Sequence, residues 1–160
     1  MIDIVLADYR DPSHQQAILM LLDAYARDPM GGGQGLDEDV KQRLLPLLAA
    51  EPGAFSVLAH VDGHPAGLVN CFQALSTFRA RPLINIHDVT VLPEYRGRGL
   101  STAMLRKVEE IARERGCCKL TLEVLEGNEI ARRAYEKFGF TGYELDPELG
   151  QALFWEKKLM

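Results

Sequence analysis

The sequence contains no apolar run near the roughly 20 residues that a membrane-spanning helix needs. It also has no excess of basic residues, because 18 lysines and arginines stand against 23 aspartates and glutamates, a formal net charge of -5. This sign of charge disfavours nucleic acid or an anionic membrane as the main partner. Residues 1–8 lack the basic start and the longer apolar stretch of a signal peptide. We therefore expect a cytoplasmic protein.

Cysteine is scarce, with only Cys71, Cys117 and Cys118. The number is odd and two of the three are adjacent, which suits neither a disulfide framework nor a Cys-x-x-Cys metal site. We predict that all three are small buried apolar side chains in a reducing compartment. No visible partner activates any of the thiols as a nucleophile, and no metal site is predicted.

The 160 residues are enough for one domain with a sizeable core, and 47% of them are hydrophobic. We see no repeat, low-complexity tail or linker, so we predict a single domain over residues 1–160. Alternating or β-branched runs predict strands at residues 2–7, 55–61, 66–76, 83–92, 118–125, 140–145 and 152–159. Helical spacing predicts helices at residues 12–29, 37–48, 100–115 and 129–138.

Local signals refine several of these boundaries. Asp11 can cap the first helix, and Pro46 predicts a kink or break in the second. Asp62-Gly63 predicts a hairpin between the second and third strands. The fourth and fifth strands flank a helix and should therefore be parallel, whereas the earlier strands have short connections and should be antiparallel. A mixed sheet with helices on both faces follows.

The most informative stretch covers residues 85–101, where the pattern changes from strand to helix. The strand stops before Pro93, which has no N–H for the ladder, and from Leu100 onward apolar residues recur at helical spacing. Between them lies Arg96-Gly-Arg-Gly99. Such a turn presents N–H groups at a helix N-terminus, its glycines allow close approach, and its arginines add positive charge. It is typical of a phosphate or pyrophosphate cradle.

Other interpretations of this turn remain. It is compatible with an ordinary strand-to-helix loop. A dinucleotide-binding turn has Glu123 in its favour, about 20 residues past the glycines, but places Thr102 where the third glycine belongs. The antiparallel strands expected before the turn also fit that fold poorly. A P-loop is excluded because no Gly-Lys-Ser/Thr follows.

The turn, preceded by Val89-Thr-Val-Leu-Pro-Glu-Tyr95, resembles motif A of the GNAT N-acetyltransferase superfamily, which reads Gln/Arg-x-x-Gly-x-Gly/Ala. Ser101 departs from the usual glycine or alanine, but serine is small enough to preserve close approach. In that superfamily the motif binds the pyrophosphate of acetyl-coenzyme A. The resemblance implies that the residues contacting this co-substrate are Val89, Val91, Arg96, Gly97, Arg98, Gly99, Leu100, Ser101 and Thr102.

Residues 128–140 resemble motif B of the same superfamily, Asn-x-x-Ala-x-x-x-Tyr-x-x-x-Gly-Phe. The resemblance implies that Tyr135 is the general acid that protonates the leaving thiolate, and that Asn128, Ala131 and Tyr135 contact coenzyme A. A tyrosine hydroxyl ordinarily has a pKa of about 10, so it can donate at neutral pH. The alternatives are a core tyrosine on the apolar helix face and, for Asn128, a plain helix cap.

The general base is less clearly marked. An alkyl ammonium group has a pKa near 10.4, so something must remove a proton before the amine attacks. Asp88 and His87 lie just before motif A, where relatives often carry an acid, and we favour Asp88 narrowly. Adjacent strand residues point to opposite faces, so only one would face the site unless a bulge intervenes. A water chain without either residue is the third option.

By resemblance the fold is an α/β (α+β) fold: a mixed, mostly antiparallel seven-stranded sheet whose fourth and fifth strands splay apart to admit the co-substrate. The function implied is transfer of acetyl from acetyl-coenzyme A to a primary amine of a small molecule or amino acid, by direct attack in a ternary complex. A backbone N–H near Val91 would bind the oxyanion. The alternatives are a non-catalytic acyl-coenzyme A-binding module and an acyltransferase with another acyl group or acceptor.

Phe154 and Trp155 belong to a homodimer interface or to the core.

Overall fold

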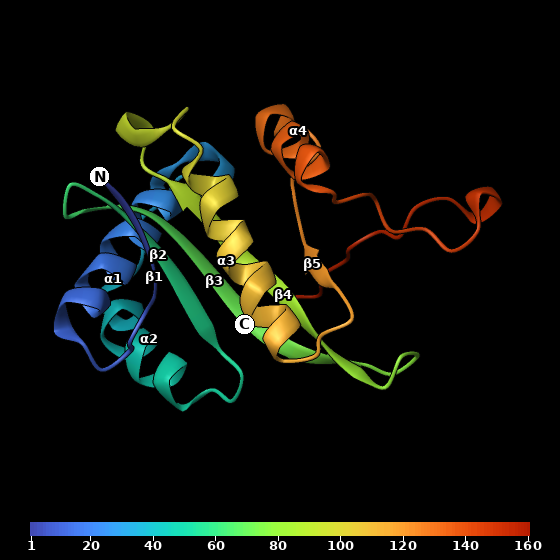
Figure 1. Cartoon of the computed structure of the whole chain (residues 1–160), viewed down its shortest axis with the longest axis horizontal. Coiled ribbons are helices and arrows are strands. Elements are labelled where there is room, and N and C mark those ends of the chain that lie inside the picture. The colour runs from blue at the N-terminus through green and yellow to red at the C-terminus, as the bar shows by residue number, and fades with distance from the viewer. The chain divides into compact units, whose positions relative to one another are not determined.

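The computed structural model describes residues 1–160 and contains two compact units, Met1–Leu125 and Glu126–Met160 (Figure 1). The first unit holds the whole sheet and the first three α-helices. The second holds the fourth α-helix and the C-terminal segment. The organisation of the chain as one domain stays a prediction.

The first unit is built on a five-stranded sheet in which spatial order follows chain order. Its strands are β1 (Ile2–Leu6), β2 (Phe55–Val61), β3 (His64–Ser76), β4 (Arg81–Val91) and β5 (Leu120–Leu122). The first four pair antiparallel and β4 pairs parallel with β5. The mixed, mostly antiparallel sheet is therefore confirmed, and its antiparallel half rules out the parallel dinucleotide-binding fold.

Three α-helices accompany the sheet: α1 (Pro12–Arg27), α2 (Glu38–Ala50) and α3 (Leu100–Glu114). Helix α1 begins where predicted, because the Asp11 side chain accepts a 2.8 Å bond from the Ser13 N–H. Helix α2 runs through Pro46 without a break. Pro46 lies on the exposed side while Leu45 and Leu48 are buried, so core packing on either side of the proline holds the helix together.

Helices cover both faces of the sheet, as predicted (Figure 1). One face packs against α1 and α2, through a cluster made of Ala17, Ile18, Leu21, Leu45, Leu48, Leu58 and Leu68. The other face carries α3. Met104 of this helix lies so close to Gly67 of β3 that a Cβ added to Gly67 would be 2.8 Å from the Met104 side chain. Leu68 and Gly67 are neighbours on β3, and neighbouring strand residues point to opposite faces. The candidate residues of β4 lie on the α1/α2 face and at the edge of this strand.

The prediction of seven strands was wrong. Residues 140–145 and 152–159 form no strands, and only the antiparallel bridge Glu144–Gln151 joins these segments, beside an Ala152 N–H to Tyr143 oxygen bond of 2.8 Å. The physical reason is that Gly142 interrupts the first pattern and a 3-10 turn, η3 (Pro147–Leu149), separates the segments. A two-stranded hairpin is marginally stable by itself.

The predicted fifth strand also proved shorter, since β5 covers only the three residues that pair with Ile84–Ile86. The cysteines separate as well: Cys71 is buried, Cys117 is half-buried and Cys118 is exposed. The prediction of three buried thiols was therefore wrong for Cys118, which lies in the short link between α3 and β5. None of the helices combines the length and the apolar character required to span a bilayer.

Candidate functional site

Strand β4 contains a β-bulge at the point where the two candidate bases lie. Asp88 pairs with Asn70 of β3 and Ile86 pairs with Cys71, so two neighbouring residues of β3 face three residues of β4. His87 is the extra residue. The bulge was the condition under which both candidates could face the same way.

The bulge places both side chains on the α1/α2 face. Asp88 accepts a 3.0 Å bond from the side-chain amide of Asn70, which shares a face with Leu68 two residues earlier. The His87 ring contacts the Phe72 ring edge-on, with 5.5 Å between centroids, and Phe72 packs against the α1/α2 cluster. Asp88 is half-buried and His87 is exposed.

Beyond the bulge, β4 has an open edge. Its pairing with β5 ends at Ile86, while the strand itself continues to Val91. The Leu92 N–H donates to Ala66 oxygen of β3 at 2.9 Å, so by antiparallel alternation the N–H and C=O groups of Val89 and Val91 point away from β3. The pairing of β4 with β5 thus ends well before β4 does, and the Val89 and Val91 backbone lies along the unpaired edge; the splaying of the two strands stays a prediction.

The glycine turn continues this open edge. Gly97 and Gly99 have φ angles of 78° and 77°, in the left-handed region that favours glycine. A Cβ built on either residue would meet nothing within 4 Å, so the turn faces open space. The first helical bond of α3 is donated by the Ala103 N–H to Gly99 oxygen at 3.0 Å.

The first turn of α3 has backbone N–H groups without a helical partner. The N–H groups of Leu100, Ser101 and Thr102 lie ahead of the first helical bond, at the positive end of the helix dipole. Leu100 is buried, which anchors the helix start, whereas Ser101 and Thr102 are half-buried. This is the arrangement that the sequence predicted for a pyrophosphate cradle.

The two arginines of the turn have different roles in the structure. Arg96 folds back on β4, where its Nε donates to Val91 oxygen at 3.0 Å and its guanidinium lies 3.6 Å from the Asp28 carboxylate. Arg98 lies over the Tyr95 ring at 5.5 Å from the centroid, a cation–π contact on the exposed surface. Both arginines are exposed, but Arg96 organises the end of β4, whereas Arg98 packs on Tyr95 within the turn.

A cavity of about 190 Å³ adjoins this end of β4. Its lining residues are Ala24, Tyr25, Arg27, Asp28, Thr90, Val91, Leu92, Pro93 and Arg96. Burial raises the pKa of Tyr25, and the negative charges of Asp88 and Asp28 raise it further. The Tyr25 hydroxyl thus stays neutral, in a field made negative by the two carboxylates.

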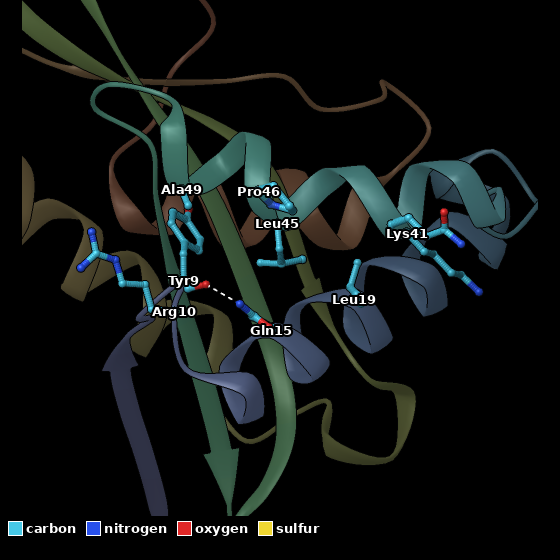
Figure 2. A pocket seen from close by; sticks show the side chains of 9 residues that line it. Tyr9, Arg10, Gln15, Leu19, Lys41, Leu45, Pro46 and Ala49 are labelled. Carbon is cyan, nitrogen blue, oxygen red and sulfur yellow. Dashed lines mark hydrogen bonds between the residues drawn. The ribbon is translucent and has the colours of Figure 1, made fainter.

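A larger cavity, of about 410 Å³, lies between the loop after β1, α1 and α2 (Figure 2). Among the side chains around it are Tyr9, Arg10 and Lys41 (Figure 2). The Gln15 side-chain amide donates to the Tyr9 backbone oxygen at 2.7 Å, which fixes the loop against α1. None of the residues predicted for the site lines this cavity, so we assign the site to the smaller one.

A buried polar chain leads to Asp88, and its members were not among the residues predicted from the sequence. The Tyr9 hydroxyl lies 2.8 Å from Ser56 Oγ, Ser56 Oγ lies 2.6 Å from Asn70 Oδ1, and Asn70 Nδ2 lies 3.0 Å from Asp88 Oδ2. Ser56 and Asn70 are 0% and 4% exposed. The available signal was a polar residue inside each of two apolar stretches, residues 55–59 of β2 and residues 66–72 of β3.

The remaining predicted residues lie in the second unit, on α4 (Glu129–Phe138). Asn128 caps this helix, since its Oδ1 accepts a 3.2 Å bond from the Ala131 N–H. Ala131 and Tyr135 lie on the half-buried face of α4, and the Tyr135 ring contacts the Phe140 ring edge-on at 5.9 Å. The helix and its cap match the prediction, and the catalytic role of Tyr135 stays a prediction.

The thiols offer no activated nucleophile. Burial raises the pKa of Cys71 well above its ordinary value, and burial also raises the pKa of Cys117. A raised pKa lowers the fraction of reactive thiolate at neutral pH. Cys71 and Cys117 are therefore poor candidates for a covalent nucleophile.

Comparison with known proteins agrees with this geometry. A model of the Acetyltransferase (GNAT) family matches residues 18–140. An uncharacterized N-acetyltransferase of Methanocaldococcus jannaschii is 35% identical over 96 residues, which cover 59% of this chain and 42% of that protein. Streptothricin acetyltransferase of Streptomyces lavendulae is 37% identical over 125 residues, which cover 76% of this chain and 58% of that protein. The chain spans about half the length of these two relatives.

Solved structures share the fold at low sequence identity. One is the aminoglycoside acetyltransferase AAC(6')-Iy in complex with the bisubstrate analogue CoA-S-monomethyl-acetylneamine, with a TM-score of 0.75 and 18% identity over 99% of both chains. At this identity the likeness concerns the fold alone.

Proposed function

The chain belongs to the acetyltransferase (GNAT) family, and from this premise we propose that it transfers an acetyl group from acetyl-coenzyme A to a primary amine of a small molecule. The observation that carries the proposal is the unpaired edge of β4 at Val89 and at the Val91 N–H, followed along the chain by the glycine turn and by the N–H groups of the first turn of α3. An anionic ligand with a long amide-bearing arm fits such a run.

The residues of the first unit fit acetyl-coenzyme A in two parts. The N–H groups around Gly99 and at the start of α3, together with Arg98, suit the pyrophosphate. The open edge of β4 at Val89 suits an amide of the pantetheine arm, in the way that a free strand edge pairs with an extended chain, and it leaves the neighbouring Val91 N–H for the thioester end. Asn128 and Ala131 of α4 are proposed as further contacts.

The proposed chemistry uses one base and one acid. Asp88 accepts a proton from the acceptor ammonium, and the free amine attacks the thioester carbonyl. A C–N bond forms, the Val91 N–H binds the oxyanion, and the C–S bond then breaks. Tyr135 gives its proton to the leaving thiolate, and the nitrogen of the new amide loses its second proton to the tyrosinate so formed, which restores Tyr135. His87, on the same sheet face, is the alternative base, with a water chain as the third route.

The acceptor is proposed to be cationic. The cavity beside β4 has Asp28 in its lining, and the charges of Asp88 and Asp28 both act on Tyr25 within it. Carboxylates near a small cavity favour an ammonium group over a carboxylate substrate. The names of the relatives, streptothricin acetyltransferase and aminoglycoside acetyltransferase, agree with a basic small molecule.

We also propose that the C-terminal segment forms a homodimer interface. Phe154 and Trp155 are large apolar side chains that are 75% and 83% exposed. Large exposed apolar side chains are enriched at the centres of interfaces. Sedimentation equilibrium of the wild type and of Phe154→Ser/Trp155→Ser tests this proposal: a dimer is expected only in the wild type.

The deciding experiment measures acetyl-coenzyme A affinity by calorimetry and acetyl transfer across a panel of amines, for the wild type and Tyr135→Phe. We expect the same affinity in both proteins and a value of kcat lower by about 100-fold in the variant, because the proton donor is lost. Tight binding without transfer in both proteins would favour a binding module. Absence of binding would contradict the cradle itself.

A further inference from the structure

The polar chain beneath the candidate base has a role that can be derived from its geometry. We propose that Asn70, Ser56 and Tyr9 are positioning residues that hold the Asp88 carboxylate in the orientation required of a general base. The inference rests on the proposed function, because it presumes that Asp88 takes the proton of the acceptor amine. Asn70, Ser56 and Tyr9 act through Asp88 and touch neither substrate.

The direction of every bond in the chain follows from Asp88. An ionised carboxylate only accepts hydrogen bonds, so the Asn70 atom 3.0 Å from Oδ2 must be the amide nitrogen. Asn70 Oδ1 then faces Ser56, and Ser56 must donate across the 2.6 Å contact. With its proton used, Ser56 accepts from Tyr9 at 2.8 Å.

All three donors therefore point toward Asp88. Chains of hydrogen bonds aligned in one sense polarise one another, and their effect is larger away from water. Ser56 is fully buried and Asn70 nearly so, and both belong to central strands whose backbones are fixed by neighbours on each side. The chain thus holds one carboxylate oxygen of Asp88 and leaves Oδ1 outside the Asn70 bond.

The chain is suited to orient a group and unsuited to move a proton. A neutral side-chain amide does not pass a proton from one neighbour to the next, so Asn70 interrupts any relay between Tyr9 and Asp88. The backbone around Asp88 gives this side chain little fixed orientation by itself. The bulge at His87 disrupts the ladder beside Asp88, so side-chain contacts must fix a carboxylate that regular pairing would otherwise hold.

A double-mutant cycle tests the inference, using Asn70→Leu, Asp88→Asn and the pair. Leucine keeps the branched shape of asparagine and removes both polar atoms. We expect Asn70→Leu to lower kcat by about 10- to 100-fold, since a small misplacement of a catalytic group has effects of this order. The KM for acetyl-coenzyme A should stay within about twofold, because the cradle is untouched. In the Asp88→Asn background, Asn70→Leu should have no further effect on kcat.

Variants at two other residues of the chain, Tyr9 and Ser56, keep the test open if Asn70→Leu folds poorly. Tyr9→Phe removes one terminal oxygen and should lower kcat by about threefold, because only the polarising end of the chain is lost. Ser56→Ala breaks the middle bond and should lower kcat by about tenfold, while Ser56→Thr retains the hydroxyl and should restore most of it. Melting temperatures separate these effects from loss of fold.

Asn85→Leu is the matched control. Asn85 also lies on β4, and its side-chain amide donates to the Thr121 hydroxyl of β5 at 3.1 Å, so the same kind of inter-strand bond is lost without touching Asp88. Asn85→Leu should therefore change kcat by the same factor in the wild type and in the Asp88→Asn background.

The outcomes separate the inference from the function beneath it. If the wild type transfers no acetyl group, the proposed function falls and the inference falls with it. If the wild type is active but kcat is unchanged in Asn70→Leu and Ser56→Ala, the positioning chain is refuted and the acetyltransferase stands. The positioning chain is likewise refuted if Asn70→Leu lowers kcat equally with and without the Asp88 carboxylate.

Discussion

Gly97 and Gly99 combine a left-handed backbone with empty space where a side chain would begin. The backbone conformation alone would make most other residues costly there, by about 1 to 2 kcal/mol. The empty space adds a functional reason, because the first atom of any side chain would project into the region proposed for the pyrophosphate. Stability and ligand affinity can therefore be separated at these positions.

Gly99→Ala should destabilise the protein by about 1 kcal/mol and weaken acetyl-coenzyme A binding by about tenfold. Gly63→Ala is the control, because Gly63 has a φ of 81° and open space around its Cβ position, but lies in the hairpin between β2 and β3. It should cause a similar loss in urea unfolding with unchanged affinity in calorimetry. Equal affinity losses in both variants would contradict the cradle.

The thiols allow a second test at this scale. Cys118 is exposed, whereas burial raises the pKa of Cys71 and Cys117, so an aromatic disulfide reagent at neutral pH should modify Cys118 first. Raising the pH toward the raised pKa of Cys117 should speed its reaction. Direct transfer further predicts that Cys71→Ala/Cys117→Ser/Cys118→Ser keeps transfer within about twofold of the wild type. Loss of transfer in the folded triple variant would indicate a covalent route.

Single residues of the site were predictable to different degrees. The glycine turn and Asn128 could be placed because local backbone demands restrict which residues occur there. The shared face of His87 and Asp88 could not, since a bulge is set by pairing with β3 and leaves no mark in β4 itself. The partners Ser56 and Asn70 lie 14 residues apart in the chain and met only through strand register.

At the scale of elements, Asp23 joins α1 to the segment that follows it. Its carboxylate accepts a 2.8 Å bond from the Leu36 N–H and a 2.9 Å bond from Arg27, and lies 3.7 Å from Lys41 of α2. The Leu36 N–H is the main cause of a lowered pKa of Asp23, with Arg27 and Lys41 adding to it. The ionised carboxylate therefore stabilises the turn between the two helices.

This contribution should depend on pH with a definite sign. A lowered folded pKa means that the stabilisation is fully present above the ordinary value of 3.8 and is lost as pH falls through the folded value. Asp23→Asn should thus lower the free energy of unfolding by about 1 kcal/mol at pH 7, and the difference should shrink below pH 3.8. Urea unfolding at pH 7 and pH 3 measures this.

Asp39→Asn is the control for that measurement. Asp39 pairs with Arg43 on the exposed surface of α2, where water screens the ion pair, so the variant should change little at either pH. A difference between wild type and Asp23→Asn that is the same at both values of pH would contradict the role of the charge.

Elements with strong local signals were the most predictable. Helix α4 has its predicted bounds, because Asn128 and Gly139 supply both caps. Helix α2 kept its course through Pro46 because burial of its apolar face outweighed one lost bond. The last two strands were predicted from apolar alternation alone. Alternation does not show whether a neighbouring strand is available for pairing, and in the structure the two segments share only one bridge.

At the scale of the whole molecule, the prediction of one domain can be tested by cooperativity. Trp155 is the single tryptophan and lies in the second compact unit, whereas most helical residues belong to the first. One domain predicts that Trp155 emission and far-ultraviolet circular dichroism report the same midpoint in urea. Two midpoints would mean that the units unfold separately, and a variant truncated after Leu125 would then remain folded.

The extra residue at His87 divides β4 into two parts that can vary separately. Before it, Ile84–Ile86 are held on both sides, by β3 and β5; after it, the strand pairs only with β3 and is the part proposed to contact the ligand. A frame shift of one position in the hairpin at residues 77–80 can be absorbed at the bulge without changing which way Val89 and Val91 face. The length of the hairpin can therefore vary while the candidate site after His87 stays in register.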